Sequence, residues 1–156
     1  MKLDKIDQQI LTLLQKQGRM TNAKLSKQVG LSAASALERV KKLERAGVIN
    51  GYHAGVDYSA VGIGLVVLVE VTLARHRQDA VKQFIEAVQP VEQILDCHHV
   101  SGKADFLLHV VAKDIAHYED FILETLSALP GLQHIESMVV LSTVKQSDAV
   151  PLYVEP

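Results

Sequence analysis

The residues best suited to binding chemistry lie in the segment 32–45, SAASALERVKKLER. This segment begins with small residues, and most of its charged residues, which lie further along, are cationic. At helical spacing Glu38, Arg39, Lys41 and Lys42 share an outward face. Lysine and arginine neutralise phosphates, an arginine can contact guanine in the major groove, and Glu38 can accept from cytosine. The small first turn lets the helix start approach base edges closely. The segment therefore predicts contact with double-stranded DNA.

An alternative interpretation stays open, in which this segment is an ordinary solvated helix face. Glu38 with Lys41 and Lys42 forms the i,i+3 and i,i+4 pairs that are typical of such a face. Free N–H groups at the helix start favour a phosphate, which supports the DNA interpretation. Aromatic residues make up only 4% of the chain and none lies on this face, so base stacking on single strands lacks a platform. The expected DNA-contacting residues are Ser32, Ala34, Ser35, Glu38, Arg39, Lys41 and Lys42.

Charge is distributed unevenly along the 156 residues, although the net charge is only −2. Residues 1–50 hold 10 Lys and Arg against 4 Asp and Glu, whereas the remainder holds 6 against 14. This asymmetry is typical of a module that meets a polyanion joined to one that does not, and chance clustering is the alternative. With no signal peptide, no apolar run of spanning length and a lone Cys97, we expect a soluble cytoplasmic protein and no membrane partner.

Catalytic and metal chemistry has a weaker basis. Asp96, Cys97, His98 and His99 are contiguous, but neighbours on a strand point to opposite faces, so the two histidines cannot chelate one ion together. The sequence contains no HExxH pattern and no paired CxxC spacing, which are typical of metal sites. The GIG at 62–64 lacks the third glycine of a dinucleotide-binding motif. We expect neither an enzyme nor a metal or cofactor site. A small-molecule binding module whose helices contact only proteins is the other alternative.

Three short helices are expected to present the cationic segment as a helix-turn-helix, whose second helix enters the major groove. The expected caps and stops are Asp4 to Gly18, Thr21 to Gly30 and Ser32 to Gly47. Ser35 and Glu38 also fit a capping box that would start the third helix later. Ser32 is preferred because it keeps the turn short.

The rest of the chain alternates strand-like and amphipathic segments. The expected order is strand 64–73, helix 77–88, strand 91–100, strand 106–112, helix 114–129 and strand 134–145. In the first of these helices Val81, Phe84, Ile85 and Val88 are in register. This β-α-β-β-α-β order is the split βαβ of ferredoxin-like folds. The predicted class is α+β: a helix-turn-helix domain (1–50), a linker strand and turn (51–63), and a ferredoxin-like dimerisation domain (64–156).

Both helices of such a fold cover one face of the sheet, and the strands look too apolar for the other face to be solvated. We therefore expect a homodimer formed sheet against sheet, unless the linker or the N-terminal domain covers this face. A dimer presents two reading helices, so the operator is expected to be a pseudo-palindrome.

Several segments together resemble the Lrp/AsnC (feast/famine) family of bacterial and archaeal transcription regulators over nearly the whole chain. They are LDKIDQQILTLLQKQGRMTNAKLSKQVGLS, LERVKKLERAGVINGY, DCHHVSGKADFLL, LPGL and VKQS. LERV and VKQS favour the leucine-responsive branch of the family. The resemblance implies a C-terminal effector domain, dimers that assemble into tetramers or octamers, and amino acids such as leucine or methionine bound between dimers.

Carried over by position, the resemblance implies an effector site at the turn Ser101, Gly102, Lys103, Ala104 and Asp105, with His99, Met138 and Val140 as weaker neighbours. Gly102 permits a tight turn whose N–H groups hold a carboxylate, and Asp105 offers a partner to an ammonium. A plain hairpin turn with Asp105 paired to Lys103 is the alternative. Two positions depart from the family pattern: Ala104 stands where an aromatic is usual, and Ala33 replaces a proline at the first turn of the third helix.

Overall fold

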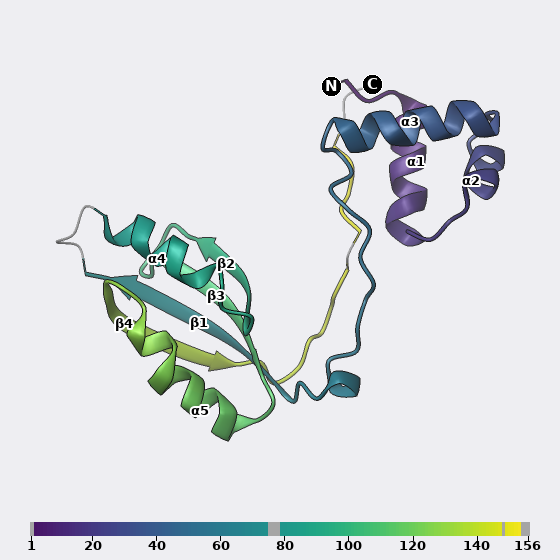
Figure 1. Ribbon diagram of the computed structural model, residues 1–156. Coiled ribbons are helices and arrows are strands. Elements are labelled where there is room, and N and C mark those ends of the chain that lie inside the picture. Colours follow the sequence, from purple (N-terminus) through teal and green to yellow (C-terminus); the bar gives the residue numbers. More distant parts are fainter. Residues whose placement is uncertain (1, 75–78, 148, 154–156) are drawn as a thin grey trace. The chain divides into compact units, whose positions relative to one another are not determined.

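The computed structural model describes residues 2–74, 79–147 and 149–153, and it divides into two compact units (Figure 1). The helical unit comprises Met1–Gly55 together with Val144–Pro156, and the sheet unit comprises Val56–Thr143. The sequence predicts a different division, in which the helical domain ends at residue 50 and residues 64–156, including those from Val144 onward, form the sheet domain. No helix in the described ranges is long and apolar enough to cross a membrane.

The helical unit contains α1 (Lys5–Lys16), α2 (Asn22–Gln28) and α3 (Ala33–Arg45). Each begins at the expected cap: the side chains of Asp4, Thr21 and Ser32 accept from backbone N–H groups in the first turns. Ser32 rather than Ser35 therefore starts α3, and the turn between α2 and α3 is short. Gly30 and Gly47 both have φ +68°, the left-handed conformation that ends a helix.

The core of the helical unit is built from one apolar stripe on each helix. Ile10 of α1, Leu25 of α2 and Leu43 of α3 are buried against one another, and Ala36 lets α3 approach closely. Burying this stripe leaves the opposite face of α3 free, which is where the cationic residues lie.

The sheet unit has the predicted element order. Its strands are β1 (Leu65–Leu73), β2 (Ile94–His99), β3 (Phe106–Ala112) and β4 (Leu132–Val139); its helices are α4 (Ala80–Val88) and α5 (Ile115–Glu124), with 3₁₀ turns η1 (Ser59–Val61) and η2 (Leu126–Ala128). The strands form one antiparallel sheet in the order β2-β3-β1-β4. The ferredoxin-like α+β prediction is confirmed in this arrangement.

Several element bounds differ from the predictions. The strand expected over residues 91–100 is the shorter β2, Ile94–His99. The helix expected from Arg77 begins at Ala80 as far as it is described, since residues 75–78 lie outside the described ranges. Helix α5 ends at Glu124 and is followed by η2, and β4 ends at Val139 rather than continuing to residue 145. Helix α4 buries Phe84 and Val88 as expected, but Val81 and Ile85 are exposed, with Ala80 in the core instead.

One face of the sheet packs against both helices. Val67, Val69 and Val71 of β1 are fully buried there together with Phe84 and Phe121. The alternate residues of β1 point to the opposite face, the open face. Its β1 residues, Val66 and Leu68 followed by Glu70 and Thr72, change from apolar to polar along the strand. The open face is therefore apolar over only part of its length, less than the sequence suggested.

Candidate nucleic-acid interface and effector site

The start of α3 is held rigidly by short-range contacts. The Ser32 hydroxyl accepts from the Ser35 N–H at 3.1 Å, and the two hydroxyls lie 2.8 Å apart. The Asn22 side-chain amide of α2 donates to the Ala33 carbonyl at 2.7 Å, which fixes the angle between the two helices. Ser32, Ala34 and Ser35 are exposed, so this end of α3 is open to a large partner.

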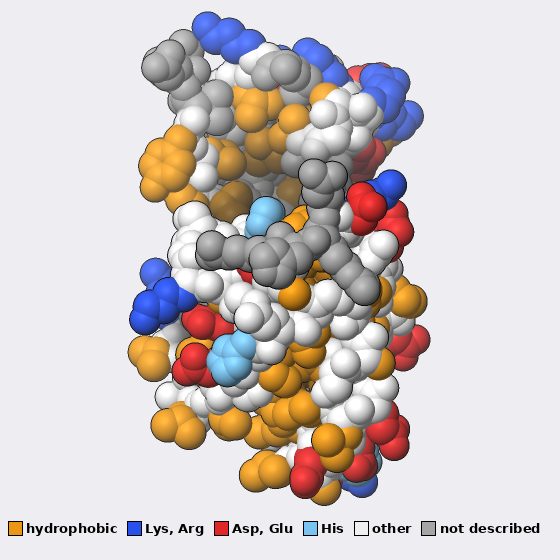
Figure 2. Space-filling view, turned by 90° about the vertical axis from the view of Figure 1, so that its left-hand side faces the viewer, with side chains coloured by type: hydrophobic (Ala, Val, Ile, Leu, Met, Phe, Trp, Pro, Cys, Tyr) orange, Lys and Arg blue, Asp and Glu red, His pale blue; other side chains and the backbone are white. Residues whose placement is uncertain are grey.

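The cationic face of α3 is solvated and weakly paired. Lys41 lies 3.6 Å from Glu38, and both side chains are at least half exposed, so the pair contributes little to folding. Lys42 is exposed and forms no ion pair with the described residues. In the view of Figure 2 several Lys and Arg side chains stand at the surface of the helical unit.

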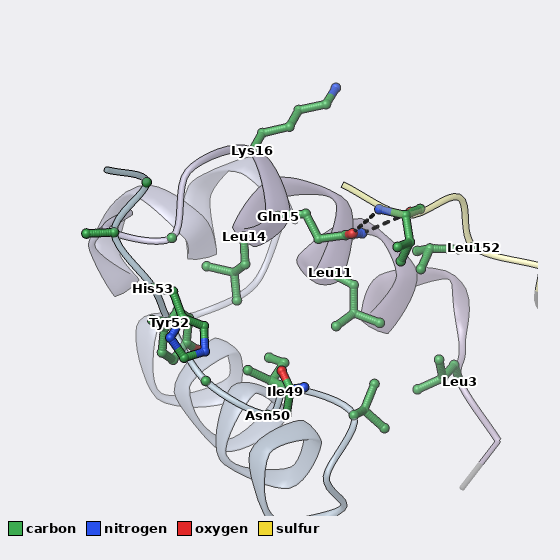
Figure 3. A pocket seen from close by; sticks show the side chains of 16 residues that line it. Leu3, Leu11, Leu14, Gln15, Lys16, Ile49, Asn50, Tyr52, His53 and Leu152 are labelled. Atoms are coloured by element: carbon green, nitrogen blue, oxygen red, sulfur yellow. Dashed lines mark hydrogen bonds between the residues drawn. The ribbon is translucent and has the colours of Figure 1, made fainter. Parts of the chain in front are cut away.

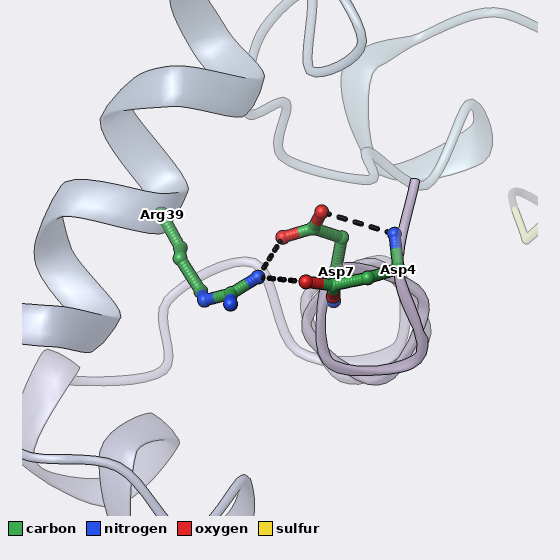
Figure 4. Close-up of polar contacts among 3 residues, drawn as sticks. All are labelled: Asp4, Asp7 and Arg39. Carbon is green, nitrogen blue, oxygen red and sulfur yellow. Dashed lines mark hydrogen bonds and ion pairs between the residues drawn. The ribbon is translucent and has the colours of Figure 1, made fainter. Parts of the chain in front are cut away.

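Arg39 is placed differently from the other candidate residues. Its Nη1 donates to Asp4 Oδ2 at 2.6 Å and to Asp7 Oδ1 at 2.8 Å, so one nitrogen bridges two carboxylates of α1 (Figure 4). The Asp7 side chain is only 4% exposed. This arrangement joins the middle of α3 to the start of α1 and turns the guanidinium away from the outward stripe formed by Glu38, Lys41 and Lys42.

The same three residues form an electrostatic cluster at the N-terminus of α1. Asp4 and Asp7 make a reciprocal capping box, with the Asp7 N–H donating to Asp4 Oδ1 at 2.8 Å and the Asp4 N–H donating to Asp7 Oδ2 at 3.2 Å. The Asp7 backbone N–H and then the Arg39 guanidinium hold the pKa of the Asp4 carboxyl below its usual range. The two carboxylates in turn raise the pKa of Arg39.

Two residues near the candidate interface, Asp7 and Leu37, were not predicted from the sequence. Asp7 is the buried acceptor that engages Arg39, and the only signal for it in the sequence was an acidic residue three positions after the Asp4 cap. Leu37 is 41% exposed on α3 although leucine is normally buried, and it lies beside the cationic face. An exposed apolar side chain at this place is suited to contact with a thymine methyl group.

The predicted effector turn joins β2 to β3, and Asp105 is built into the sheet. Its carboxylate Oδ2 accepts from the Leu73 N–H at 2.7 Å, and its own N–H donates to the Val71 carbonyl at 2.9 Å. No ion pair between Asp105 and Lys103 is present among the described residues, so the paired-hairpin alternative lacks its contact. Its second carboxylate oxygen, Oδ1, accepts no hydrogen bond from the described residues.

Two other residues of the turn differ from expectation. Gly102 does not use the left-handed conformation, and a side-chain carbon added there would meet no atom within 4 Å. The turn therefore does not depend on glycine at this position. Ala104 is buried, whereas Ser101, Gly102 and Lys103 are exposed.

Of the remaining effector candidates, His99 lies next to the turn, whereas Met138 and Val140 lie apart from it within one chain. His99 stacks on Phe106 at a ring-centroid distance of 4.8 Å. Met138 pairs with Leu68, and the Val140 N–H donates to the Val66 carbonyl, whereas Asp105 bonds to Leu73 at the other end of β1. At about 3.3 Å per residue these two groups are roughly 20 Å apart. One protomer alone does not bring the expected site together.

The contiguous Asp96, Cys97, His98 and His99 do not form a reactive cluster. His98 pairs with Leu107 on the open face, whereas His99 and Cys97 pair with Phe106 and Leu108 on the helix-covered face. Burial raises the pKa of the Cys97 thiol, the opposite of what a nucleophilic cysteine needs. Within the described ranges no three His, Cys, Asp or Glu side chains are placed to hold a metal ion.

A helix-turn-helix unit with an exposed cationic helix, joined to a ferredoxin-like unit, defines a DNA-binding transcription regulator with a ligand-binding domain. Family models agree with both parts: residues 3–50 match a winged helix-turn-helix DNA-binding domain, and residues 66–150 match the Lrp/AsnC ligand-binding domain. The chain belongs to the Lrp/AsnC family, whose members are transcription regulators rather than enzymes.

Individual relatives match over almost their whole lengths. The leucine-responsive regulatory protein of Escherichia coli K12 is 47% identical over 146 residues, which cover 94% of this chain and 89% of that protein. A transcriptional regulator from Neisseria meningitidis, solved in complex with L-Met, has a TM-score of 0.92 and 36% identity, covering 97% and 98% of the two chains. An AsnC family regulator from Agrobacterium tumefaciens has a TM-score of 0.89 and 30% identity, covering 96% and 97%.

Proposed function

We propose that this regulator reads a pseudo-palindromic operator with α3, through Ser32, Ala34, Ser35, Glu38, Lys41 and Lys42. The observation that carries the proposal is the exposed face of α3, which is cationic at Lys41 and Lys42 and begins with small, open residues. Arg39 acts in this proposal as a positioning residue, because its guanidinium is engaged by Asp4 and Asp7. This positioning role replaces the base contact that the sequence predicts for Arg39.

The test is a gel-shift titration of the gene's own upstream region with the Lys42→Glu variant. Reversing a charge beside the phosphates should weaken binding at least tenfold, because a lost contact and a new repulsion act together. Lys82→Glu is the matched control, since Lys82 is an exposed lysine of α4 in the sheet unit. Equal affinity of the Lys42→Glu variant and the wild type would overturn the DNA assignment.

We also propose that the dimer forms through the apolar part of the open face, around Val66, Leu68 and Met138. Met138 lies directly opposite Leu68 on the neighbouring strand, and this large apolar residue is 39% exposed. Sedimentation of Met138→Glu should show dissociation to monomers at concentrations where the wild type is dimeric. The control is Leu123→Glu, which changes an exposed leucine of α5 on the helix side. A dimeric Met138→Glu variant would contradict this interface.

The proposed effector is a small amino acid, with leucine and methionine as the first candidates, bound at the turn 101–105 of one dimer and beside Val140 of another. Met138 belongs to the proposed dimer interface and is left out of this site. The wide separation of the turn and Val140 within one chain supports a site completed by assembly to a tetramer or octamer. Calorimetric titration with L-leucine and L-methionine measures binding. Sedimentation with and without each amino acid measures whether binding depends on assembly. Binding without any dependence on assembly, or no binding by any amino acid, would contradict the proposed site.

A further inference from the structure

The chain enters the helical unit twice, which gives this unit a second connection to the rest of the molecule. Residues up to Gly55 and residues from Val144 onward belong to the same compact unit, although the sheet unit separates them in sequence. We call the described residues 144–147 and 149–153 the C-terminal segment. Two covalent connections therefore restrain the DNA-binding unit, provided that the C-terminal segment stays bound to it.

The C-terminal segment is anchored at one residue by a two-way contact. The Val150 N–H donates to Gln15 Oε1 at 2.6 Å, and Gln15 Nε2 donates to the Val150 carbonyl at 3.3 Å (Figure 3). A side-chain amide that satisfies both backbone groups of one residue imitates the pairing of a neighbouring strand. Gln15 thereby recognises extended backbone rather than a particular side chain.

An apolar contact supports this anchor two residues further on. Leu152 packs against the core cluster of the helical unit, which contains Ile10 and Leu11 of α1. Val150 and Leu152 also form one wall of a cavity of about 800 Å³, whose other walls come from α1 and from residues 48–55. The C-terminal segment thus closes a surface that the helix-turn-helix would otherwise leave open.

The described residues 141–147 are exposed, unlike the anchored Leu152, which is partly buried. Leu141 and Val144 are both 95% exposed, so β4 and the anchor are joined by a solvated connection. From Val139 to Val150 an extended chain reaches at most about 40 Å. The linker from Gly55 to β1 reaches about 36 Å at most, so the C-terminal connection adds no shorter limit on distance. It adds a second attachment, and a unit held at two points turns less freely than a unit held at one.

We propose that the C-terminal segment is a strap, held by Gln15 and Leu152, that restricts the turning of each DNA-binding unit and so favours binding to two half-sites at once. A unit that samples fewer orientations presents the second helix-turn-helix to the second half-site at a higher effective concentration. This consequence for DNA rests on the proposed function, whereas the strap itself does not.

Hydrogen exchange of the full-length protein tests the strap without DNA. Gln15→Ala should speed exchange at the Val150 amide about fivefold or more, the ratio that corresponds to loss of one typical hydrogen bond. Gln9→Ala is the matched control, because Gln9 is an exposed glutamine of the same helix with no side-chain hydrogen bond among the described residues. Unchanged exchange at Val150 in Gln15→Ala would overturn the strap, whatever the DNA measurements show.

Fluorescence anisotropy with one-half-site and two-half-site operator DNA tests the consequence. In Gln15→Ala and in a chain ended after Lys145, the preference for two half-sites should fall several-fold, while affinity for one half-site stays as in the wild type. In the shortened chain Gln15→Ala should have no further effect, since Gln15 acts only through the segment. An undiminished preference in both variants would overturn the proposed restriction of turning. Absence of any preference in the wild type would instead overturn the two-half-site operator of the proposed function.

Discussion

At the scale of single residues, Arg39 shows how an ionic side chain can be drawn into the fold. The residue lies on a helix whose other charged residues face solvent, yet its Nη1 bridges Asp4 and Asp7. Asp7 is almost fully buried, and a buried carboxylate without a partner is costly. Removing the guanidinium is therefore expected to affect folding before it affects DNA recognition.

We expect Arg39→Ala to lower the free energy of unfolding of the helical unit by about 1.5–3 kcal/mol, the range for hydrogen bonds to charged groups. Hydrogen exchange at α1 and α3 amides would report this unit separately from the sheet. Lys41→Ala is the control, with an expected change within about 0.5 kcal/mol because its ion pair is exposed. Equal effects of the two substitutions would refute the positioning role of Arg39.

The Asp4 carboxyl makes stability depend on pH. Its folded-state pKa is lowered, mainly by the Asp7 N–H and then by Arg39, so the charged form is favoured in the native state. The contribution is therefore complete above the ordinary aspartate pKa of about 3.9 and is lost as pH falls through the folded-state value. Asn caps helices about as well as Asp, so Asp4→Asn removes the charge and keeps the cap.

Denaturant unfolding of the wild type and of Asp4→Asn between pH 7 and pH 2.5 measures this contribution. The wild type should be the more stable of the two near neutral pH, and the difference should shrink as the solution becomes more acidic. A difference that grows on acidification would show that the Asp4 charge is unfavourable in the folded protein.

At the scale of elements, the start of α3 is built to accept a proline at its first position. Ser32 has φ −66° and ψ 154°, which is the extended conformation required of a residue before proline. Ala33 is the first helical residue, where the missing N–H of proline is tolerated. Ala33→Pro should therefore leave the fold intact and raise stability by about 0.4–1 kcal/mol, through a less flexible unfolded chain.

Thermal unfolding of Ala33→Pro beside Ala36→Pro checks this expectation. The Ala36 N–H donates to the Ser32 carbonyl at 3.0 Å, so proline there removes a helix hydrogen bond and should cost about 3 kcal/mol or more. If both variants were destabilised alike, α3 would begin elsewhere than at Ser32.

The sequence predicted elements well wherever a local interaction defines them. The caps at Asp4, Thr21 and Ser32 act within four residues, and all three are confirmed. The exposure of Val81 and Ile85 on α4 could not be predicted, because periodicity identifies an apolar stripe but not which edge of it meets the sheet. The Arg39 contact with Asp7 spans 32 residues, and the Gln15 contact with Val150 spans 135, so neither leaves a pattern in the sequence.

At the scale of the whole molecule, the charge asymmetry of the sequence corresponds to the two units. The cations gather in the part that contains α3, and the acidic residues predominate in the sheet unit, which the proposed DNA-binding mode keeps away from phosphates. A net charge of −2 thus conceals a strongly cationic binding surface, and binding should depend on salt as for a basic protein.

Salt dependence gives a count of the phosphate contacts made by α3. Each phosphate contact changes the slope of log K against log salt by about 0.9. Replacing Lys41 and Lys42 by Gln in both protomers of a dimer removes four cations, so the slope should become less steep by about 3 to 4. Lys82→Gln in α4 should leave the slope unchanged, because Lys82 lies in the sheet unit. A double variant that bound more weakly but with the wild-type slope would mean that these lysines support the helix rather than contact phosphates.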